Sequence, residues 1–255
     1  DETKQLMPMP VVLANRIVRE LSACRQSSYI QGILPDGKAQ VTVEYENGKP
    51  VRLDSVVVSC QHTEDKNLKK LEAEIRKKVL LPALRLLPPD EDTKIFINPS
   101  GRFVCGGMDA DTGLTGRKLM VDSYGSMVPH GGGAFSGKDC SKVDRSATYM
   151  ARYIAKNIVA AGLASKCQVS LAYAIGVAQP VMVQVDTFGT GKVCADDCLE
   201  LAIPLVFGMT PKQIVDSLRL TRPIFRQTAA FGHFGRKEFP WERTDKVEAL
   251  RNAVI

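Results

Sequence analysis

Glycine, lysine and aspartate are concentrated in the middle of this 255-residue sequence, where they could bind a phosphorylated ligand. Ten of the 20 glycines fall between Gly101 and Gly137. Glycine lets a ligand approach the main chain, and main-chain N–H groups at a helix N-terminus bind anions. Between Arg102 and Arg145 the sequence also has six Lys or Arg and five Asp. This mixture suits a Mg²⁺–polyphosphate complex, because Mg²⁺ takes one or two carboxylates together with phosphate oxygens.

The segment from Gly132 to Lys138 has the spacing of a Walker A loop, but it departs from that motif at the next residue. Asp139 stands where the motif requires Ser or Thr. We therefore exclude a standard nucleoside triphosphatase and retain a phosphate-binding loop. The alternative is a set of tight turns without a ligand.

The residues that follow this loop are expected to open a helix. Ser141 and Asp144 have the spacing of a capping box. Asp144 is therefore either a capping carboxylate or a metal ligand. Lys138 and Lys142 oppose the dipole of the expected helix, which favours an anion bound beside them.

The elements that must position the loop form two similar units, which indicates an α+β fold with pseudo-symmetry and repeated βαββαβ-type units. Residues 40–45 are echoed by residues 168–173, and each string is followed by a glycine turn and a second β-rich stretch. Two unrelated α+β units are the alternative. We predict domains at residues 1–104 and 105–255. The expected helices are 9–21, 68–87, 143–163 and 196–207, and the expected strands include 95–97, 118–122 and 224–225.

Composition indicates a globular protein, and its mild positive charge fits an anionic small ligand as well as nucleic acid. The net charge is +6 without any block of five like charges, so we expect no nucleic-acid partner. We also expect no membrane-spanning segment, because the apolar runs are short. Seven scattered cysteines suit reduced thiols and a cytoplasmic location. The sequence lacks a starting Met, so we expect a fragment or a processed chain.

Several motifs together resemble the S-adenosylmethionine synthetase (methionine adenosyltransferase) family. The glycine-rich signature of that family is similar to residues 133–139 (GAFSGKD) and 141–146 (SKVDRS). Four further stretches match: 35–38 (PDGK), 98–103 (NPSGRF), 111–118 (DTGLTGRK) and 229–236 (AAFGHFGR). The resemblance covers essentially the whole chain. The stretch around Met108 departs from the form common in the family, which leaves the local loop shape open.

The resemblance implies a transferase of one-carbon metabolism that makes S-adenosylmethionine from ATP and L-methionine. The methionine sulfur displaces the triphosphate in line, and the triphosphate is then hydrolysed to diphosphate and phosphate. Two of the family's three domains are expected here, the central and C-terminal ones, with the N-terminal domain absent from this chain. The chain alone is then incomplete as an enzyme. The alternative is a non-catalytic ATP-binding or regulatory subunit.

The resemblance also implies ligands, partners and site residues. It implies two Mg²⁺ per site, K⁺, and a homodimer or homotetramer with active sites at the subunit interface. The expected catalytic residues are Lys38, Arg117, Lys118 and Lys138. The expected ATP-binding residues are Asp36, Lys38, Arg102, Phe103, Asp111, Arg117, Lys118, Ala134, Lys138 and Ile175, with Phe103 stacking on the adenine. Asp111 and Lys142 are expected to bind methionine, and Asp144 to bind the metal.

Overall fold

The computed structural model describes residues 1–113 and 116–254, so the middle of the 111–118 motif and the last residue lie outside the described part. The described residues form two compact units. The N-terminal unit consists of Glu2 and residues 8–113, and the C-terminal unit of residues 1, 3–7 and 116–254. The domain boundary expected after residue 104 stays a prediction.

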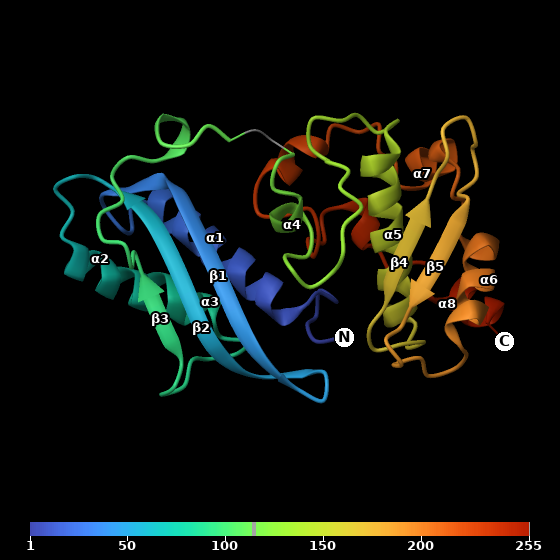
Figure 1. Ribbon diagram of the computed structural model, residues 1–255, viewed down its shortest axis with the longest axis horizontal. Helices are drawn as coiled ribbons and strands as arrows, with labels where there is room; N and C mark the ends of the chain where they lie inside the picture. The colour runs from blue at the N-terminus through green and yellow to red at the C-terminus, as the bar shows by residue number, and fades with distance from the viewer. Residues whose placement is uncertain (114–115, 255) are drawn as a thin grey trace. The chain divides into compact units, whose positions relative to one another are not determined.

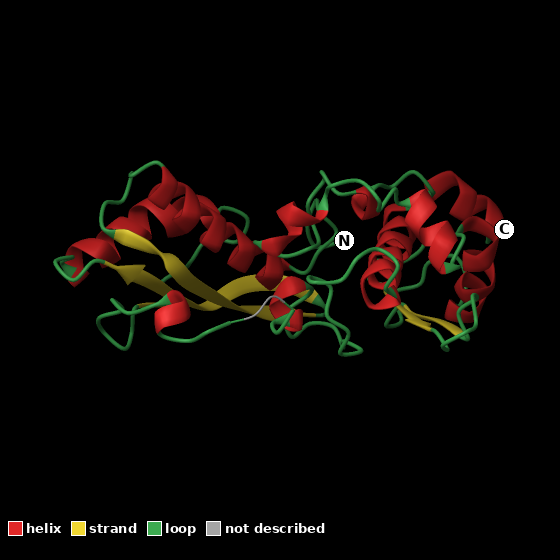
Figure 2. Ribbon diagram, turned by 90° about the horizontal axis from the view of Figure 1, so that it is seen from above, coloured by secondary structure: helices red, strands yellow, loops and turns green. Residues whose placement is uncertain are grey.

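The N-terminal unit is a three-stranded sheet with helices along one face (Figures 1 and 2). The strand order is β1–β2–β3, with β1 antiparallel and β3 parallel to β2. Asn47 and Gly48 form the two-residue turn of the β1–β2 hairpin, and both have the positive φ that such a turn requires. The elements are α1 (Met9–Gln26), β1 (Ile33–Glu46), β2 (Lys49–His62), α2 (Leu68–Ile75), η1 (Arg76–Leu80), α3 (Leu81–Ala83), β3 (Lys94–Ile97) and η2 (Gly107–Asp109).

The apolar stripe of α1 packs on the inner face of this sheet. Leu13 and Ile17 of α1 are fully buried in one cluster with Leu53 and Val56 of β2. The predicted first helix and hairpin are therefore confirmed. The second predicted helix, 68–87, is shorter than expected: a π-helical stretch follows α2, and α3 ends at Ala83.

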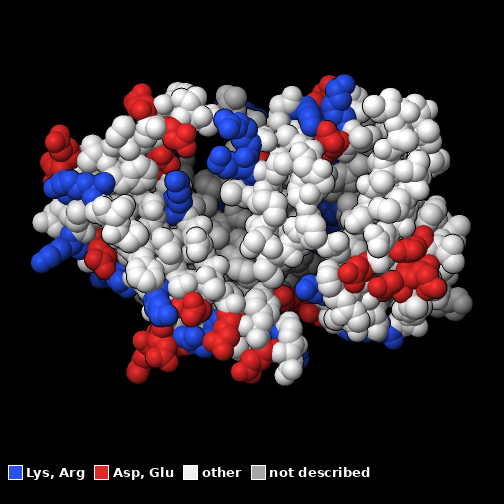
Figure 3. Space-filling view, in the orientation of Figure 1, with Lys and Arg blue, Asp and Glu red and all other residues white. Residues whose placement is uncertain are grey.

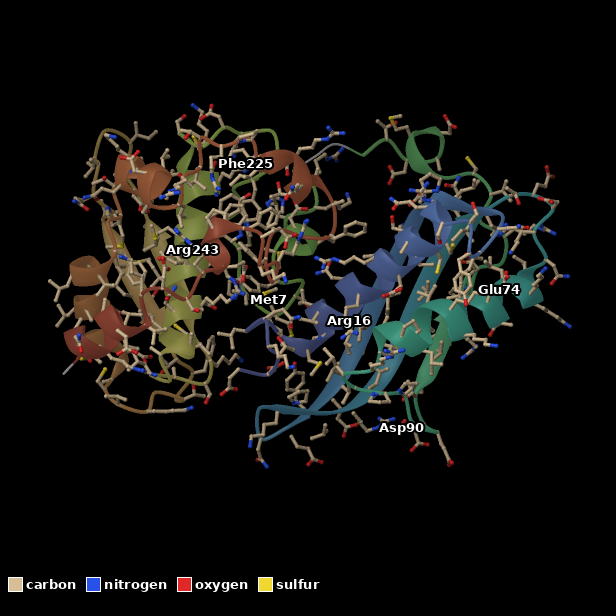
Figure 4. All side chains as sticks on the ribbon, turned by 180° about the vertical axis from the view of Figure 1, so that it is seen from behind. Met7, Arg16, Glu74, Asp90, Phe225 and Arg243 are labelled. Atoms are coloured by element: carbon tan, nitrogen blue, oxygen red, sulfur yellow. The ribbon has the colours of Figure 1, made fainter. Side chains whose placement is uncertain are left out.

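Ion pairs fix the outer surface of this second helical segment. Glu74 of α2, labelled in Figure 4, accepts hydrogen bonds from Lys66 at 2.7 Å and from Lys78 at 3.3 Å. The two ammonium groups hold the pKa of the Glu74 carboxyl below its usual value.

The C-terminal unit is built around α5 and a two-stranded antiparallel sheet, with β4 packed on α5 and β5 on α6 (Figure 1). The rings of Tyr149 in α5 and Trp241 stack at 3.7 Å between centroids. The elements are α4 (Leu119–Asp122), α5 (Val143–Ala160), β4 (Gln168–Ala172), β5 (Met182–Asp186), α6 (Asp196–Val206), α7 (Pro211–Ser217), η3 (Phe225–Ala229), η4 (Pro240–Glu242) and α8 (Val247–Ala253).

Two predicted strands of this unit are wrong. Residues 119–122 form α4 with Lys118 as the N-cap, and the main-chain N–H of Asp122 donates to the carbonyl of Lys118. Residues 224–225 lead into the 3₁₀ turn η3, where the Phe225 carbonyl accepts from the Thr228 hydroxyl at 2.7 Å. Within the described residues, the sheet of this unit contains only β4 and β5, so neither segment has a neighbouring strand to pair with.

The α+β class with two domains of the expected kind is confirmed, although the internal repeat is incomplete. Both units follow the order helix, hairpin, helix, but only the N-terminal unit adds a third strand in the described part. Across residues 1–113 and 116–254, no single helix is long and apolar enough to cross a bilayer. In the same residues, α6 and α7 taken together have the length and composition of a membrane-spanning segment, but they are bent by 75° at their junction.

A buried ion cluster joins separate segments of the C-terminal unit. Glu242 accepts from Arg152 at 3.0 and 2.8 Å and from Lys156 at 2.7 Å, and its side chain is fully buried. It also accepts from the main-chain N–H of Gly235 at 2.8 Å. Arg152 further donates to the carbonyls of Gln5 and Leu6, so residues near the N-terminus are held to α5. These two cations hold the pKa of Glu242 low despite its burial.

We expect Glu242→Gln to lower the free energy of unfolding by about 3–5 kcal/mol, because it leaves two buried cations without their counter-charge. Denaturant unfolding of the full chain measures this. Glu248→Gln is the matched control, since Glu248 pairs with Arg251 on the surface and such pairs contribute about 0–1 kcal/mol. Equal losses in the two variants would contradict a structural role for the cluster.

Candidate functional site

The predicted site residues divide between the two units. Each unit holds a set whose geometry can be described by itself. The N-terminal unit contains Asp36, Lys38, Arg102, Phe103 and Asp111. The C-terminal unit contains Arg117, Lys118, Ala134, Lys138, Lys142, Asp144 and Ile175.

In the C-terminal unit, the glycine-rich loop folds back onto the first turn of α5. Lys138 donates from Nζ to Oδ2 of Asp144 at 2.6 Å, so the two predicted polyphosphate and metal residues form an ion pair. Gly133 lies directly against the Asp144 carboxylate, where any Cβ would overlap it. Glycine at 133 is therefore required for the loop to close over Asp144.

The capping-box interpretation of this region is wrong. The N-cap of α5 is Lys142, without a side-chain cap, and Asp144 lies within the first turn. The main-chain N–H of Ser141 instead donates to Oδ1 of Asp139 at 2.7 Å. Hydrogen bonds from the Ser141 hydroxyl and then from this N–H lower the pKa of the Asp139 carboxyl. The carbonyl of Lys142 accepts hydrogen bonds from the main-chain N–H and from the hydroxyl of Ser146. Lys142 itself is exposed.

A buried arginine that sequence reasoning counted only as a nearby cation fixes the backbone of this loop. Arg145 donates to the carbonyl of Lys138 at 2.8 Å, to the Tyr149 hydroxyl at 3.1 Å and to the Thr228 hydroxyl at 2.9 Å. Its guanidinium lies 3.6 Å from the ring centroid of Phe225, which is labelled in Figure 4. The main chain at Lys138 is thus held from inside the unit.

His233 also supports the glycine-rich loop, through contacts with Ser136 in the loop and Tyr149 in α5. Its Nδ1 lies 2.7 Å from the Tyr149 hydroxyl, and its Nε2 lies 3.4 Å from the Ser136 hydroxyl. Burial lowers the pKa of His233 to about 3, and the positive charges of Arg145 and Arg236 add to this effect. The imidazole is therefore neutral near pH 7 and acts as a hydrogen-bonding support.

The remaining predicted residues of the C-terminal unit differ in how closely they approach the loop. Gly116, at φ +87°, packs so that a Cβ would lie 3.0 Å from Cβ of Ala134. This contact brings the exposed Arg117 and Lys118 beside the glycine-rich loop. Ile175 follows β4, and its side chain is fully exposed.

In the N-terminal unit, three predicted residues gather at the end of β2. Asp36 accepts from the main-chain N–H of Gly107 at 2.8 Å. Phe103 is bonded through its main chain to His62, and Arg102 donates to the carbonyl of Glu64 at 2.6 Å. Lys38 and Asp111 are exposed.

The charged surface and the donor set are compatible with a metal–phosphate ligand. Basic and acidic side chains are interspersed on the face in Figure 3. The described residues contain no group of three or more His, Cys, Asp or Glu that could hold a metal by themselves. Mg²⁺ does not need one, because it binds through one or two carboxylates plus phosphates and water. The Asp144 side chain, 49% exposed, fits that mode if Lys138 moves to the phosphate.

Comparison with protein-family models gives two adjacent matches. Residues 1–103 match the central domain of S-adenosylmethionine synthetase. Residues 105–243 match the C-terminal domain of the same enzyme family. Together the matches span both units and include every predicted site residue.

We expect His233→Gln to flatten the dependence of unfolding free energy on pH between about 6.5 and 3. The unfolded His has a pKa near 6.5, so it binds a proton in this window that the folded protein excludes. His233 therefore contributes stability above about pH 6.5 that is lost as the pH falls. Denaturant unfolding at several pH values measures the slope. If the slope of unfolding free energy against pH were the same in the variant, His233 would bind a proton as readily in the folded protein as in the unfolded one.

Proposed function

This chain belongs to the S-adenosylmethionine synthetase family, and we propose that it takes part in making S-adenosylmethionine from ATP and L-methionine. In the proposed reaction the methionine sulfur attacks the 5′ carbon of ATP. The C5′–O bond breaks and the triphosphate leaves, to be hydrolysed to diphosphate and phosphate. A thioether has no proton to lose, so the first step needs alignment and stabilisation of the leaving charge rather than a base.

The observation that carries this proposal is the Lys138–Asp144 pair on a glycine-rich loop with a fixed backbone. The pair places a cation and a carboxylate 2.6 Å apart at the start of α5. A Mg²⁺–polyphosphate complex needs both groups. In the proposed complex Lys138 turns to the phosphate, and Asp144 becomes free to hold Mg²⁺, which neutralises phosphate charge when bound.

We assign the other residues by the same chemistry and by the family's pattern. Arg117, Lys118 and Lys138 contact the polyphosphate. Asp36, Lys38 and Arg102 bind ATP, and Phe103 stacks on the adenine. Asp111 faces ATP and methionine, and Lys142 lies near methionine. Ala134 and Ile175 pack near the nucleoside.

The assembly is proposed on the same basis. We propose a homodimer or homotetramer with sites shared between subunits, and the full exposure of Ile175 supports its use at such an interface. The proposal includes the domain boundary after residue 104, which the adjacent family matches support. It also includes K⁺, to which we assign no residue of this chain, and a cytoplasmic location. Binding of ATP without turnover by the assembled protein would favour the non-catalytic role instead.

We expect Lys138→Met, in an active form of the protein, to lower kcat by about 100-fold or more, on the scale of a lost oxyanion donor. The Michaelis constant for methionine should change little, because methionine carries no phosphate. Steady-state kinetics with each substrate varied measures both values. Lys212→Met is the matched control, since Lys212 is 84% exposed and pairs with Asp216 on the surface of α7. Turnover within a few-fold of the parent would remove Lys138 from the catalytic residues.

We expect Asp144→Asn to weaken Mg²⁺ activation by about 10-fold or more, in the range reported for groups that tune a metal site. The amide keeps the shape of the carboxylate beside Gly133 but loses its charge. Titration of activity with Mg²⁺ at saturating ATP gives the apparent affinity. The result would count against a metal role if Asp144→Asn and the parent had equal Mg²⁺ requirements.

A further inference from the structure

A bulge in β1 leaves one glutamine at the end of β2 facing three residues. Ile33 pairs with His62 and Gly37 pairs with Cys60, so residues 34–36 bulge opposite Gln61. The bulge takes the main-chain N–H of Asp36 out of the β ladder. Oε1 of Gln61 accepts from that N–H at 3.2 Å. β-Bulges often re-aim side chains next to functional sites, and here the bulge carries Asp36.

The other end of the Gln61 amide reaches the segment that carries Phe103. Nε2 of Gln61 donates to the carbonyl of Val104 at 2.9 Å. Asp36 completes the bridge, because its carboxylate accepts from the main-chain N–H of Gly107 at 2.8 Å. One side-chain amide therefore joins the bulge of β1 to the residue directly after Phe103.

The segment is already bound to β2 on the other side of this bridge. The Asn98 side chain bonds to both the N–H and the carbonyl of Cys60, at 2.7 and 3.0 Å. Phe103 donates from its N–H to Nε2 of the fully buried His62 at 3.1 Å, and its carbonyl accepts from the His62 N–H at 2.9 Å. With Gln61 in place, the main chain is held on both sides of Phe103, and only its side-chain torsions remain to be set.

Gly106 packs against the Gln61 amide and limits where that amide can lie. A Cβ on Gly106 would lie 2.6 Å from Cδ and 2.8 Å from Nε2 of Gln61. The backbone at Gly106 has φ −154°, which any residue adopts. An alanine there would therefore displace the Gln61 side chain without straining the main chain.

We propose that Gln61 is a positioning residue for the nucleotide base, acting through Phe103. This inference rests on the proposed function, in which Phe103 stacks on the adenine of ATP. Loss of the Gln61 amide leaves residues 104–107 tied to the β1 bulge through the Gly107–Asp36 contact, so the Phe103 main chain can shift. The main-chain N–H of Asp36, which we also assign to ATP, loses the same partner. The phosphate-binding groups of the glycine-rich loop lie on other segments, so the defect is confined to ligands that carry a base.

The test compares a substrate that has the base with one that lacks it. In the active protein, we expect Gln61→Leu to raise the Michaelis constant for ATP in synthesis by about 10-fold, as the loss of two net hydrogen bonds allows. The Michaelis constant for added inorganic tripolyphosphate, in the hydrolysis half-reaction, should stay within about 2-fold, since that ligand makes no contact through Phe103. Gly106→Ala should reproduce both results. Gln26→Leu, the same change at an exposed position of α1, should alter neither.

Phe103→Ala separates a failure of this inference from a failure of the proposed function. Phe103→Ala should also raise the Michaelis constant for ATP alone. Adding Gln61→Leu to it should cause a smaller further change than Gln61→Leu causes by itself, because the shared part of the effect acts through the Phe103 ring. If Phe103→Ala is selective for ATP but Gln61→Leu and Gly106→Ala are not, the inference is overturned and the function stands. If Phe103→Ala affects ATP and tripolyphosphate equally, the assigned base contact fails and the inference with it.

Discussion

The contacts of the buried Glu242 carboxylate determine how the C-terminal unit is assembled. Breaking such a pair is costly because the surviving charges stay buried, so the partners of Glu242 are held together in the folded unit. Arg152 and Lys156 place it on α5, and the carbonyls of Gln5 and Leu6 are drawn to the same arginine. The same helix carries Arg145 two turns earlier, where it holds the main chain of Lys138. One helix therefore connects the buried charge cluster to the glycine-rich loop.

Local pattern was sufficient to predict the elements that bury a regular apolar face. The first helix and the β1–β2 hairpin follow from side-chain periodicity and from the Asn47–Gly48 turn, which are properties of neighbouring residues. Residues 118–122 and 224–225 could not be assigned in this way. Each is a short segment that also depends on partners far away in the sequence. The main-chain N–H of His233 donates to the carbonyl of Asp122 at 2.8 Å, and the Arg145 guanidinium donates to the Thr228 hydroxyl of η3.

The candidate site also contains features that the local sequence pattern predicts and features that it does not. The glycine-rich loop and its lysines stand out in the sequence because their residue types and spacing are unusual. Gln61 gave no such signal, since a single glutamine is common anywhere. His233 lies in the matching stretch 229–236, but its residue type alone did not indicate its contacts. Their roles come from which main-chain groups lie within reach after folding, and for Gln61 this depends on the register shift between β1 and β2. The glycine at position 106, which leaves room for the Gln61 amide, is the one residue nearby whose type fits the role of Gln61.

The Lys138–Asp144 pair has a consequence for how ionic strength acts on ligand binding. Because each group already faces an opposite charge at 2.6 Å, the loop presents little net field from this pair before a ligand arrives. In the proposed function, binding of a metal–polyphosphate would replace the Lys138–Asp144 pair by a Lys138–phosphate contact and an Asp144–metal contact. The number of neutralised charges at these two positions would then stay constant. Salt weakens long-range attraction between exposed charges more than such an exchange. Under the proposed function, the salt sensitivity of ligand association would come mainly from Arg117 and Lys118, which are exposed.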